Sequence, residues 1–367
     1  MTRHYLDHAS TSPTRPVAID AITRALHDLT GDPGRIHREG ITARVAIESA
    51  RDEVAAFFGC RSSREVVFTS GATESIATAV FGSANRGGHQ VVTAVEHSAV
   101  RLAVDNAGES TVVGVDGLGR VDVDGVARAI RADTACVHVQ WGNHEVGTVQ
   151  PVMDVVAACR ERDVLVHVDA AQAAGHVAIA FESLGCDLMS VSAHKLGGGP
   201  GVGALLVRRG VRLRPLLVGG DQERARRAGY ENVPAIAGFG AALASIDVEA
   251  EAAAQGALTA RLLAGIDEGL VPYGDLTNRL PHLLCFGVPG IEPQAVLLGL
   301  DRAGIAAHSG SACSSEALEP SPVLRAMGVD AHRSLRLSVG WSSTPDDIDA
   351  VLDALPRVIA DLRRLTR

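Results

Sequence analysis

The sequence predicts an α/β protein with a mainly parallel sheet and a second, smaller α+β domain. Short apolar runs rich in β-branched residues alternate with helical periodicity through the first two thirds of the chain. The alternation changes near residue 245, and a chain of 367 residues exceeds the roughly 150 residues of one domain. We therefore expect a large domain over residues 15–245 and a small domain built from residues 1–14 together with 246–367.

The expected strands of the large domain are nearly continuous in apolar character, as in strands buried on both faces. They lie at residues 65–69, 90–95, 135–141, 164–168, 188–191 and 203–207. Helical patterns fall between them, at residues 75–84, 97–106, 123–131 and 151–162. The small domain should hold a long helix at 244–265, β-runs at 283–288 and 335–339, and a closing helix capped by Thr344 and kinked at Pro356.

The charge balance and hydropathy exclude several classes of function. The 34 basic and 43 acidic residues give a net charge of −9, which argues against nucleic acid as a direct partner. No apolar run approaches the roughly 18 residues that would span a membrane. The N-terminal residues lack an apolar signal core, so we expect a cytoplasmic protein.

Lys195 is the only lysine among the 34 basic residues. A general preference for arginine explains why lysine is scarce, but it does not explain why this one remains. Lysine can form an imine with an aldehyde, whereas arginine stays charged and cannot. Either Lys195 is a chance remnant or, as we favour, its amine has a chemical role.

The six cysteines show no C-x-x-C spacing, which excludes zinc ribbons and thioredoxin-like motifs, and we expect no metal site. Five of them lie in apolar stretches typical of a protein core. Cys313 instead follows the small polar run His308–Ala312, where a thiol would be accessible. A second glycine-rich run, 199–204, fits a dinucleotide fingerprint but leads into an expected strand rather than a helix, which disfavours that reading.

Polar residues follow the C-terminal ends of five expected strands. One such residue would usually be a helix cap or a surface group, but ligands of open α/β sheets bind at this edge. Together these residues offer an anion cradle, a carboxylate, several imidazoles and the only lysine, which suits pyridoxal phosphate. The five segments are 69–74, 96–97, 142–145, 169–172 and 192–195.

Several motifs then resemble those of the cysteine desulfurases. They are YLDHA at 5–9, FTSGATES at 68–75, VDAAQ at 168–172, SAHK at 192–195, and SGSAC at 309–313 with LEP at 318–320. Their order and spacing agree over essentially the whole chain, and the short SGSAC loop is similar to the NifS/IscS-type branch. The resemblance implies a class V, fold-type I pyridoxal-phosphate enzyme.

The resemblance also implies a role for each matching residue. Lys195 would bind the cofactor covalently and later move the substrate α-proton. Asp169 would pair with the pyridinium nitrogen, and Gln172 would bond the ring hydroxyl. His97 would stack on the ring and transfer protons, because imidazole titrates near neutral pH. The phosphate would be held by Ala72, Thr73, Ser192 and His194.

The substrate would be bound by Asn143 and Arg336, the latter clamping its carboxylate with a bidentate pair. Cys313 would attack the substrate sulfur as a thiolate, keep it as a persulfide and leave L-alanine. Its activating group stays open between His97, His308 and the cofactor's neighbours. L-cysteine and a sulfur-acceptor protein are the implied partners, in a homodimer.

The chain departs from the family pattern at four places. His144 replaces an asparagine that usually contacts the cofactor, and Tyr230 replaces a threonine that usually reaches the neighbouring subunit's phosphate. Residues 32–35 replace an Asn-Pro-Ser-Ser run, and Trp341 stands where arginine is frequent. These changes put substrate entry, rate or partner docking in question.

Two other functions stay open: another class V enzyme, such as an aminotransferase or lyase, and a catalytically silent scaffold. The sequence does not distinguish cysteine from selenocysteine, nor iron–sulfur assembly from thiolation. An arginine cluster is best explained as a solvated or dimer-interface face, although an acidic sulfur acceptor would also fit it. The cluster consists of Arg208, Arg209, Arg212, Arg214, Arg224, Arg226 and Arg227.

Overall fold

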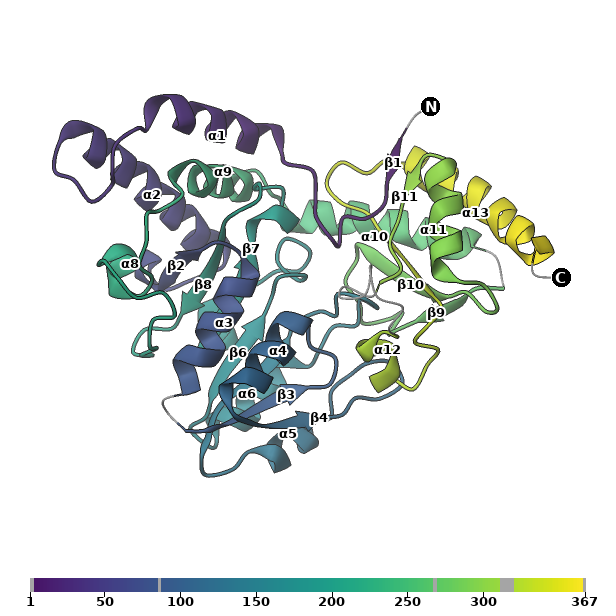
Figure 1. Cartoon of the computed structure of the whole chain (residues 1–367), viewed down its shortest axis with the longest axis horizontal. Coiled ribbons are helices and arrows are strands. Elements are labelled where there is room, and N and C mark those ends of the chain that lie inside the picture. The colour runs from purple at the N-terminus through teal and green to yellow at the C-terminus, as the bar shows by residue number, and fades with distance from the viewer. Residues whose placement is uncertain (1–2, 85–86, 267–268, 311–319, 366–367) are drawn as a thin grey trace.

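The computed structural model describes residues 3–84, 87–266, 269–310 and 320–365 (Figure 1). A seven-stranded sheet has the order β2-β8-β7-β6-β5-β3-β4. All its neighbouring pairs are parallel except those of β8, which is antiparallel to both β2 and β7. The strands are β2 (Val66–Thr69), β3 (His89–Thr93), β4 (Glu109–Val113), β5 (Thr134–Gln140), β6 (Leu165–Asp169), β7 (Leu188–Ser192) and β8 (Gly203–Val207).

The predicted α/β class with a mainly parallel sheet is confirmed. Because β8 reverses direction between β2 and β7, those two strands point the same way. The C-terminal ends of β2, β3, β5, β6 and β7 therefore lie at one edge of the sheet, as the polar strand ends required. Edge strand β4 was not predicted, because four of its five side chains are not buried and it lacks the apolar run of the inner strands.

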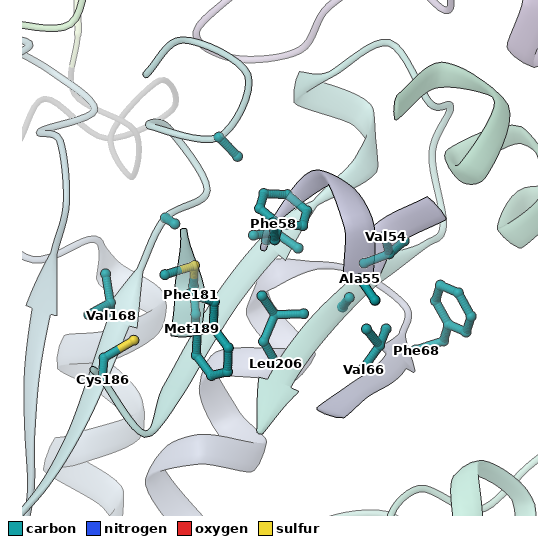
Figure 2. Close-up of a cluster of buried hydrophobic side chains, with 14 of the residues drawn as sticks. Val54, Ala55, Phe58, Val66, Phe68, Val168, Phe181, Cys186, Met189 and Leu206 are labelled. Atoms are coloured by element: carbon teal, nitrogen blue, oxygen red, sulfur yellow. The ribbon is translucent and has the colours of Figure 1, made fainter. Parts of the chain in front are cut away.

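Helices cover the sheet and bury its apolar faces. Figure 2 shows part of this core, where Phe58, Phe181, Met189 and Leu206 pack together with almost no exposed surface. The helices of this part are α1 (Pro16–Asp28), α2 (Arg38–Phe57), α3 (Ala72–Ser83), α4 (Ser98–Ala107), α5 (Val123–Ala129), α6 (Val152–Arg160), α7 (Phe181–Leu184), α8 (Gln222–Ala225) and α9 (Val233–Ala244). The short 3₁₀ turns are Ser63–Glu65 and Ala193–Lys195.

The long helix predicted over 244–265 is confirmed, although it begins at Val248 rather than at residue 244. Helix α9 ends at Ala244, and α10 (Val248–Gly265) begins after Asp247, whose side chain accepts the Ala250 N–H at 3.0 Å. No single helix in the described part of the chain is long and apolar enough to cross a membrane. Helices α9 and α10 pass that test only as a pair, bent by 78° where they meet.

A second apolar cluster forms the core of the smaller part, whose helices α11 and α13 lie beside each other in Figure 1. It draws on Leu6 and on residues from Leu258 to Ile359, whereas the larger cluster spans Ala43 to Leu243. The domain boundaries at residues 15 and 245 stay a prediction. The remaining elements are β1 (His4–Tyr5), β9 (Val271–Tyr273), β10 (Leu283–Gly287), α11 (Pro293–Arg302), β11 (Ile305–Ala306), α12 (Pro322–Ala326), β12 (Ser334–Ser338) and α13 (Pro345–Leu365).

Candidate active site

A cavity of about 420 Å³ opens at the edge of the sheet where the five strands end. Residues of the N-terminal segment and of β12 also line the cavity, so the large sheet and the smaller part of the chain both contribute to it. Ten of the residues predicted for the site line this cavity: Ala72, Thr73, His97, His144, Asp169, Gln172, Ser192, His194, Lys195 and Arg336. Cys313 lies outside the described residues.

The end of β2 and the first turn of α3 form a cradle suited to an anion. The first N–H groups of a helix have no helical partners and carry partial positive charge. Gly71 precedes α3 with φ of +156°. Gly203, in β8, lies against it: a Cβ on Gly203 would be only 2.7 Å from the Gly71 Cα, so this close approach requires glycine. Ser192 Oγ, on a side chain only 1% exposed, has no hydrogen-bond partner among the described residues. A phosphate would supply the missing acceptor.

Lys195 is carried into the cavity by the 3₁₀ turn that follows β7. Burial lowers the pKa of its amine to about 8, an effect that the nearby Asp169 opposes and Arg336 reinforces. A substantial fraction of the amine is therefore neutral, and nucleophilic, near physiological pH.

Asp169 ends β6, and its Oδ1 accepts the Ala171 N–H at 3.0 Å. Burial raises the pKa of this carboxyl, while the Ala171 N–H and Lys195 act in the opposite direction. A protonated pyridine nitrogen would give the carboxylate the cation that its buried position demands. Gln172 donates its Nε2 to the Ala9 carbonyl at 2.8 Å, which leaves Oε1 to accept from a ring hydroxyl.

His97 caps α4, where its Nδ1 accepts the Ala99 N–H at 3.1 Å, so the proton of the neutral ring sits on Nε2. Burial, together with His144, Lys195 and Arg101, lowers the pKa of His97 to about 2. The expectation that this ring titrates near neutral pH is therefore corrected: the ring is neutral, with its proton on Nε2.

His144 presents its ring edge to His97, with the ring centroids 5.0 Å apart. Its side chain is buried, and its Nδ1 has no partner among the residues that the structure describes. Burial lowers the pKa of His144 well below its ordinary value. It is therefore a neutral group with one ring nitrogen left for a bound molecule.

The structure does not bring Asn143 into the cavity, although the sequence analysis expected it to bind substrate. Its Oδ1 accepts the N–H groups of Glu145 and Val146, and its Nδ2 donates to the Val95 carbonyl. Asn143 thus shapes the turn that carries His144.

Arg336, in β12, does face the cavity and is only 2% exposed. It donates to the His144 carbonyl at 2.7 Å and to Asp7 Oδ1 at 2.9 Å, while its Nε has no partner within the described part of the chain. Because Arg336 lines the cavity, its guanidinium can meet a substrate carboxylate there.

Sequence reasoning did not assign a role to every residue around this site. Glu74 lines the cavity and Asp7 contacts Arg336, but the motifs that contain them predicted no separate role for either carboxylate. His308 also lines the cavity, with its Nδ1 accepting the Gly310 N–H at 2.9 Å. The sequence analysis named His308 only as one of the groups that could activate Cys313, and its place in the cavity wall was not predicted.

These residues fit pyridoxal phosphate at three separate points. The lysine amine matches its aldehyde, the Asp169 carboxylate its ring nitrogen, and the cradle with Ser192 its phosphate. No group of three or more metal-ligating side chains occurs among the described residues.

Comparisons with known proteins agree with this chemistry. The "Aminotransferase class-V" family profile matches residues 4–351. A cysteine desulfurase of Gluconacetobacter diazotrophicus is 41% identical over 383 residues, covering 100% of this chain and 96% of that protein. Cysteine desulfurase IscS of Dictyoglomus turgidum is 38% identical, covering 99% and 96%.

A solved NifS-like protein superposes with a TM-score of 0.92 at 32% identity, covering 98% of this chain and 100% of that one. The structure of SspA in complex with cysteine gives a TM-score of 0.82 at 28% identity, covering 92% and 99%. The chain belongs to the class-V aminotransferase family, whose members depend on pyridoxal phosphate. Within that family it belongs with the cysteine desulfurases.

Proposed function

We propose that this protein carries out the reaction of its family, converting L-cysteine to L-alanine with pyridoxal phosphate and passing the sulfur to an acceptor protein. The observation that carries the proposal is that the only lysine shares one cavity with Asp169 and the anion cradle. The sulfur carrier is Cys313, assigned from the SGSAC motif alone because it lies outside the described residues.

When bound, the cofactor supplies an aldehyde and an electron-accepting ring. Lys195 holds it covalently through the amine and moves the substrate α-proton, a task suited to a pKa of about 8. Asp169 would hold the ring nitrogen in its charged form, and Gln172 would orient the ring. Neutral His97 and His144 line the cavity and would contact the ring and keep water from it.

Arg336 binds the substrate carboxylate, so that the substrate sulfur is oriented towards the sulfur carrier. The Cys313 thiolate attacks this sulfur, and an S–S bond forms as the Cβ–S bond of the substrate breaks. The electron pair of the broken bond stays with the carbon skeleton, which takes up protons and leaves as L-alanine.

We infer that the protein is a homodimer, the commonest symmetric assembly. Large apolar side chains are exposed in α2 and in the loop that precedes it, which is unusual for a monomer. Examples are Ile36 at 94% and Val45 at 62%, while Tyr230, in the loop that reaches the neighbouring site in this family, is 62% exposed. Light scattering tests this inference: a monomer mass at micromolar concentration with full activity would refute it.

We also infer a cytoplasmic location. The five cysteines within the described residues are free thiols, which suits a reducing compartment. Iron–sulfur assembly and thiolation would use the same persulfide, so the acceptor's identity must come from trapping it on Cys313 in a cell extract.

Product analysis tests the proposed function. The purified protein, loaded with pyridoxal phosphate and given L-cysteine and a thiol reductant, should release L-alanine and sulfide in equal amounts. A keto acid product would instead identify an aminotransferase, and ammonia with pyruvate a lyase. A protein that binds the cofactor but turns over neither cysteine nor selenocysteine would be a silent scaffold, and would refute the proposal.

A further inference from the structure

A carboxylate lies in the wall of the cavity beside the anion cradle. Glu74 is in the first turn of α3, and its Oε2 accepts the Ser70 N–H at 2.8 Å. Its bonds to Arg227 and Ser70 lower the pKa of Glu74, so it is negative at neutral pH. A negative side chain next to a site for a phosphate would repel that ligand unless another charge compensates it.

Arg227 supplies the compensating charge. Its Nε donates to Glu74 Oε1 at 2.8 Å and its Nη2 to Oε2 at 3.3 Å, so the guanidinium engages both carboxylate oxygens. The two side chains are only 19% and 11% exposed, which limits screening by water and salt. The pair fixes the carboxylate in the orientation that binds Ser70.

The segment that delivers Arg227 is built at a cost in backbone strain. Glu223, Arg224 and Ala225 all have positive φ, at 48°, 58° and 59°. Residues other than glycine disfavour this conformation, because their Cβ clashes with the backbone. Such a run persists only where surrounding contacts hold it.

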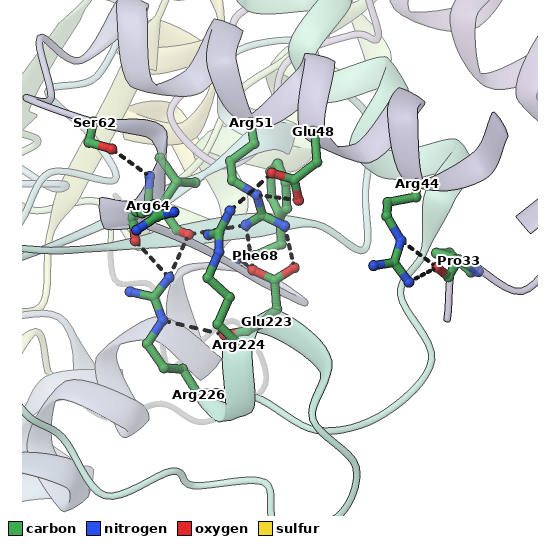
Figure 3. Close-up of polar contacts among 11 residues, drawn as sticks. Pro33, Arg44, Glu48, Arg51, Ser62, Arg64, Phe68, Glu223, Arg224 and Arg226 are labelled. Carbon is green, nitrogen blue, oxygen red and sulfur yellow. Dashed lines mark hydrogen bonds and ion pairs between the residues drawn. The ribbon is translucent and has the colours of Figure 1, made fainter. Parts of the chain in front are cut away.

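Figure 3 shows the contacts that hold this segment. Glu223 is buried and receives two hydrogen bonds from Arg51, at 2.6 and 2.7 Å. Glu223 Oε2 also accepts the Phe68 N–H at 2.9 Å. Phe68 belongs to β2, the strand that leads directly into the cradle. Glu223 therefore attaches the strained segment to the strand that supports the cradle, close to where Arg227 pairs with Glu74.

We propose that Arg227 is a positioning residue for the phosphate end of the cofactor. By pairing with Glu74 it cancels the negative charge beside the Ser70–Thr73 turn, which would receive a dianion. The inference rests on the proposed function, because it assumes that the cradle takes the phosphate of pyridoxal phosphate. It assigns a role to a residue 153 positions away from Glu74 that does not itself line the cavity.

The test compares two ligands that differ only in the phosphate. The dissociation constants of pyridoxal phosphate and pyridoxal are measured by absorbance titration of the cofactor-free full chain. Arg227→Gln should raise the constant for pyridoxal phosphate roughly tenfold and leave that for pyridoxal unchanged, because only the phosphate meets the uncompensated carboxylate. Adding Glu74→Gln to this variant should return the constant towards the wild-type value.

Arg224→Gln is the matched control, since Arg224 lies in the same strained segment but pairs with Glu48, at 3.0 Å. It should leave both constants unchanged. Equal weakening of both ligands by Arg227→Gln, no effect at all, or no recovery in the double variant would overturn the inference. If Arg227→Gln does not fold, Glu74→Gln alone decides: weaker binding of pyridoxal phosphate there would contradict the proposal. A wild-type chain that binds neither ligand would instead refute the proposed function.

Discussion

The guanidinium of Arg336, which lines the cavity, donates a hydrogen bond to the Asp7 carboxylate at 2.9 Å, joining residues 329 positions apart. The same guanidinium also donates to Ser10 Oγ at 2.7 Å and to the His144 carbonyl at 2.7 Å. These three acceptors hold the planar group in one orientation before any substrate arrives. Preorganisation of this kind lowers the cost of binding a carboxylate.

We expect Arg336→Lys to raise the KM for L-cysteine roughly tenfold while cofactor binding is retained. A lysine ammonium cannot bridge Asp7, Ser10 and the His144 carbonyl with a planar fork and still serve a substrate. Steady-state kinetics and the absorbance of the bound cofactor provide the two readouts. An unchanged KM would show that Arg336 does not bind the substrate carboxylate.

Lys195 gives a prediction about pH, because its amine must be neutral to react with an aldehyde. With its pKa lowered to about 8, the rate at which the cofactor-free chain captures pyridoxal phosphate should rise with pH and level off above about 8. Stopped-flow absorbance follows this reaction.

Lys195→Ala should show no cofactor fixed by borohydride, since no second lysine exists. Fixation of the cofactor in that variant would exclude Lys195 as the residue that binds it covalently.

A buried polar chain crosses four strands of the sheet and gives a prediction about stability. His138 bonds to Gln90 through Nε2 and to His167 through Nδ1 at 3.0 Å, and His167 Nε2 bonds to Ser190 Oγ at 2.7 Å. Burial lowers the pKa of His138 to about 3 and that of His167 well below its ordinary value. Both rings are therefore neutral in the folded protein.

Because the folded pKa of His138 lies below the unfolded value of about 6.5, its contribution is complete above pH 6.5 and is lost as the pH falls below it. Between pH 6.5 and 5.5, the wild type should lose about 1 kcal/mol more of its free energy of unfolding than His138→Gln. Urea unfolding at both pH values gives this difference. Taking the difference cancels the opposite effect of Glu96, whose pKa burial raises to about 8. Equal losses in the two proteins would show that His138 is not held neutral.

Local patterns were sufficient for the sheet and for most of the site. Buried parallel strands appear in the sequence as continuous apolar runs, and their ends appear as abrupt changes to polar residues, as at Asp169 and Ser192. Strand β4 was not predicted because it lies at the sheet edge, is largely exposed and therefore lacks a continuous apolar run. The start of α10 was placed too early, at residue 244 rather than Val248, because Asp247 was not recognised as a helix cap.

Contacts between residues far apart in the sequence could not be predicted from local sequence patterns. Arg227 and Glu74, or Arg336 and Asp7, meet only because the fold brings them together. The motif around Asn143 was equally ambiguous, since an asparagine serves a turn as readily as a ligand. The lowered pKa of His97 depends on its burial and on the nearby side chains of His144, Lys195 and Arg101, which one sequence cannot show.

The central claim is that Cys313 carries the sulfur. Mass spectrometry of the loaded protein after treatment with L-cysteine measures this directly. We predict an added mass of one sulfur atom, about 32 Da, on the peptide containing Cys313 and on no other cysteine peptide. Cys313→Ser should bind pyridoxal phosphate normally yet release no sulfide. Sulfur on a different cysteine, together with an active Cys313→Ser variant, would contradict the account.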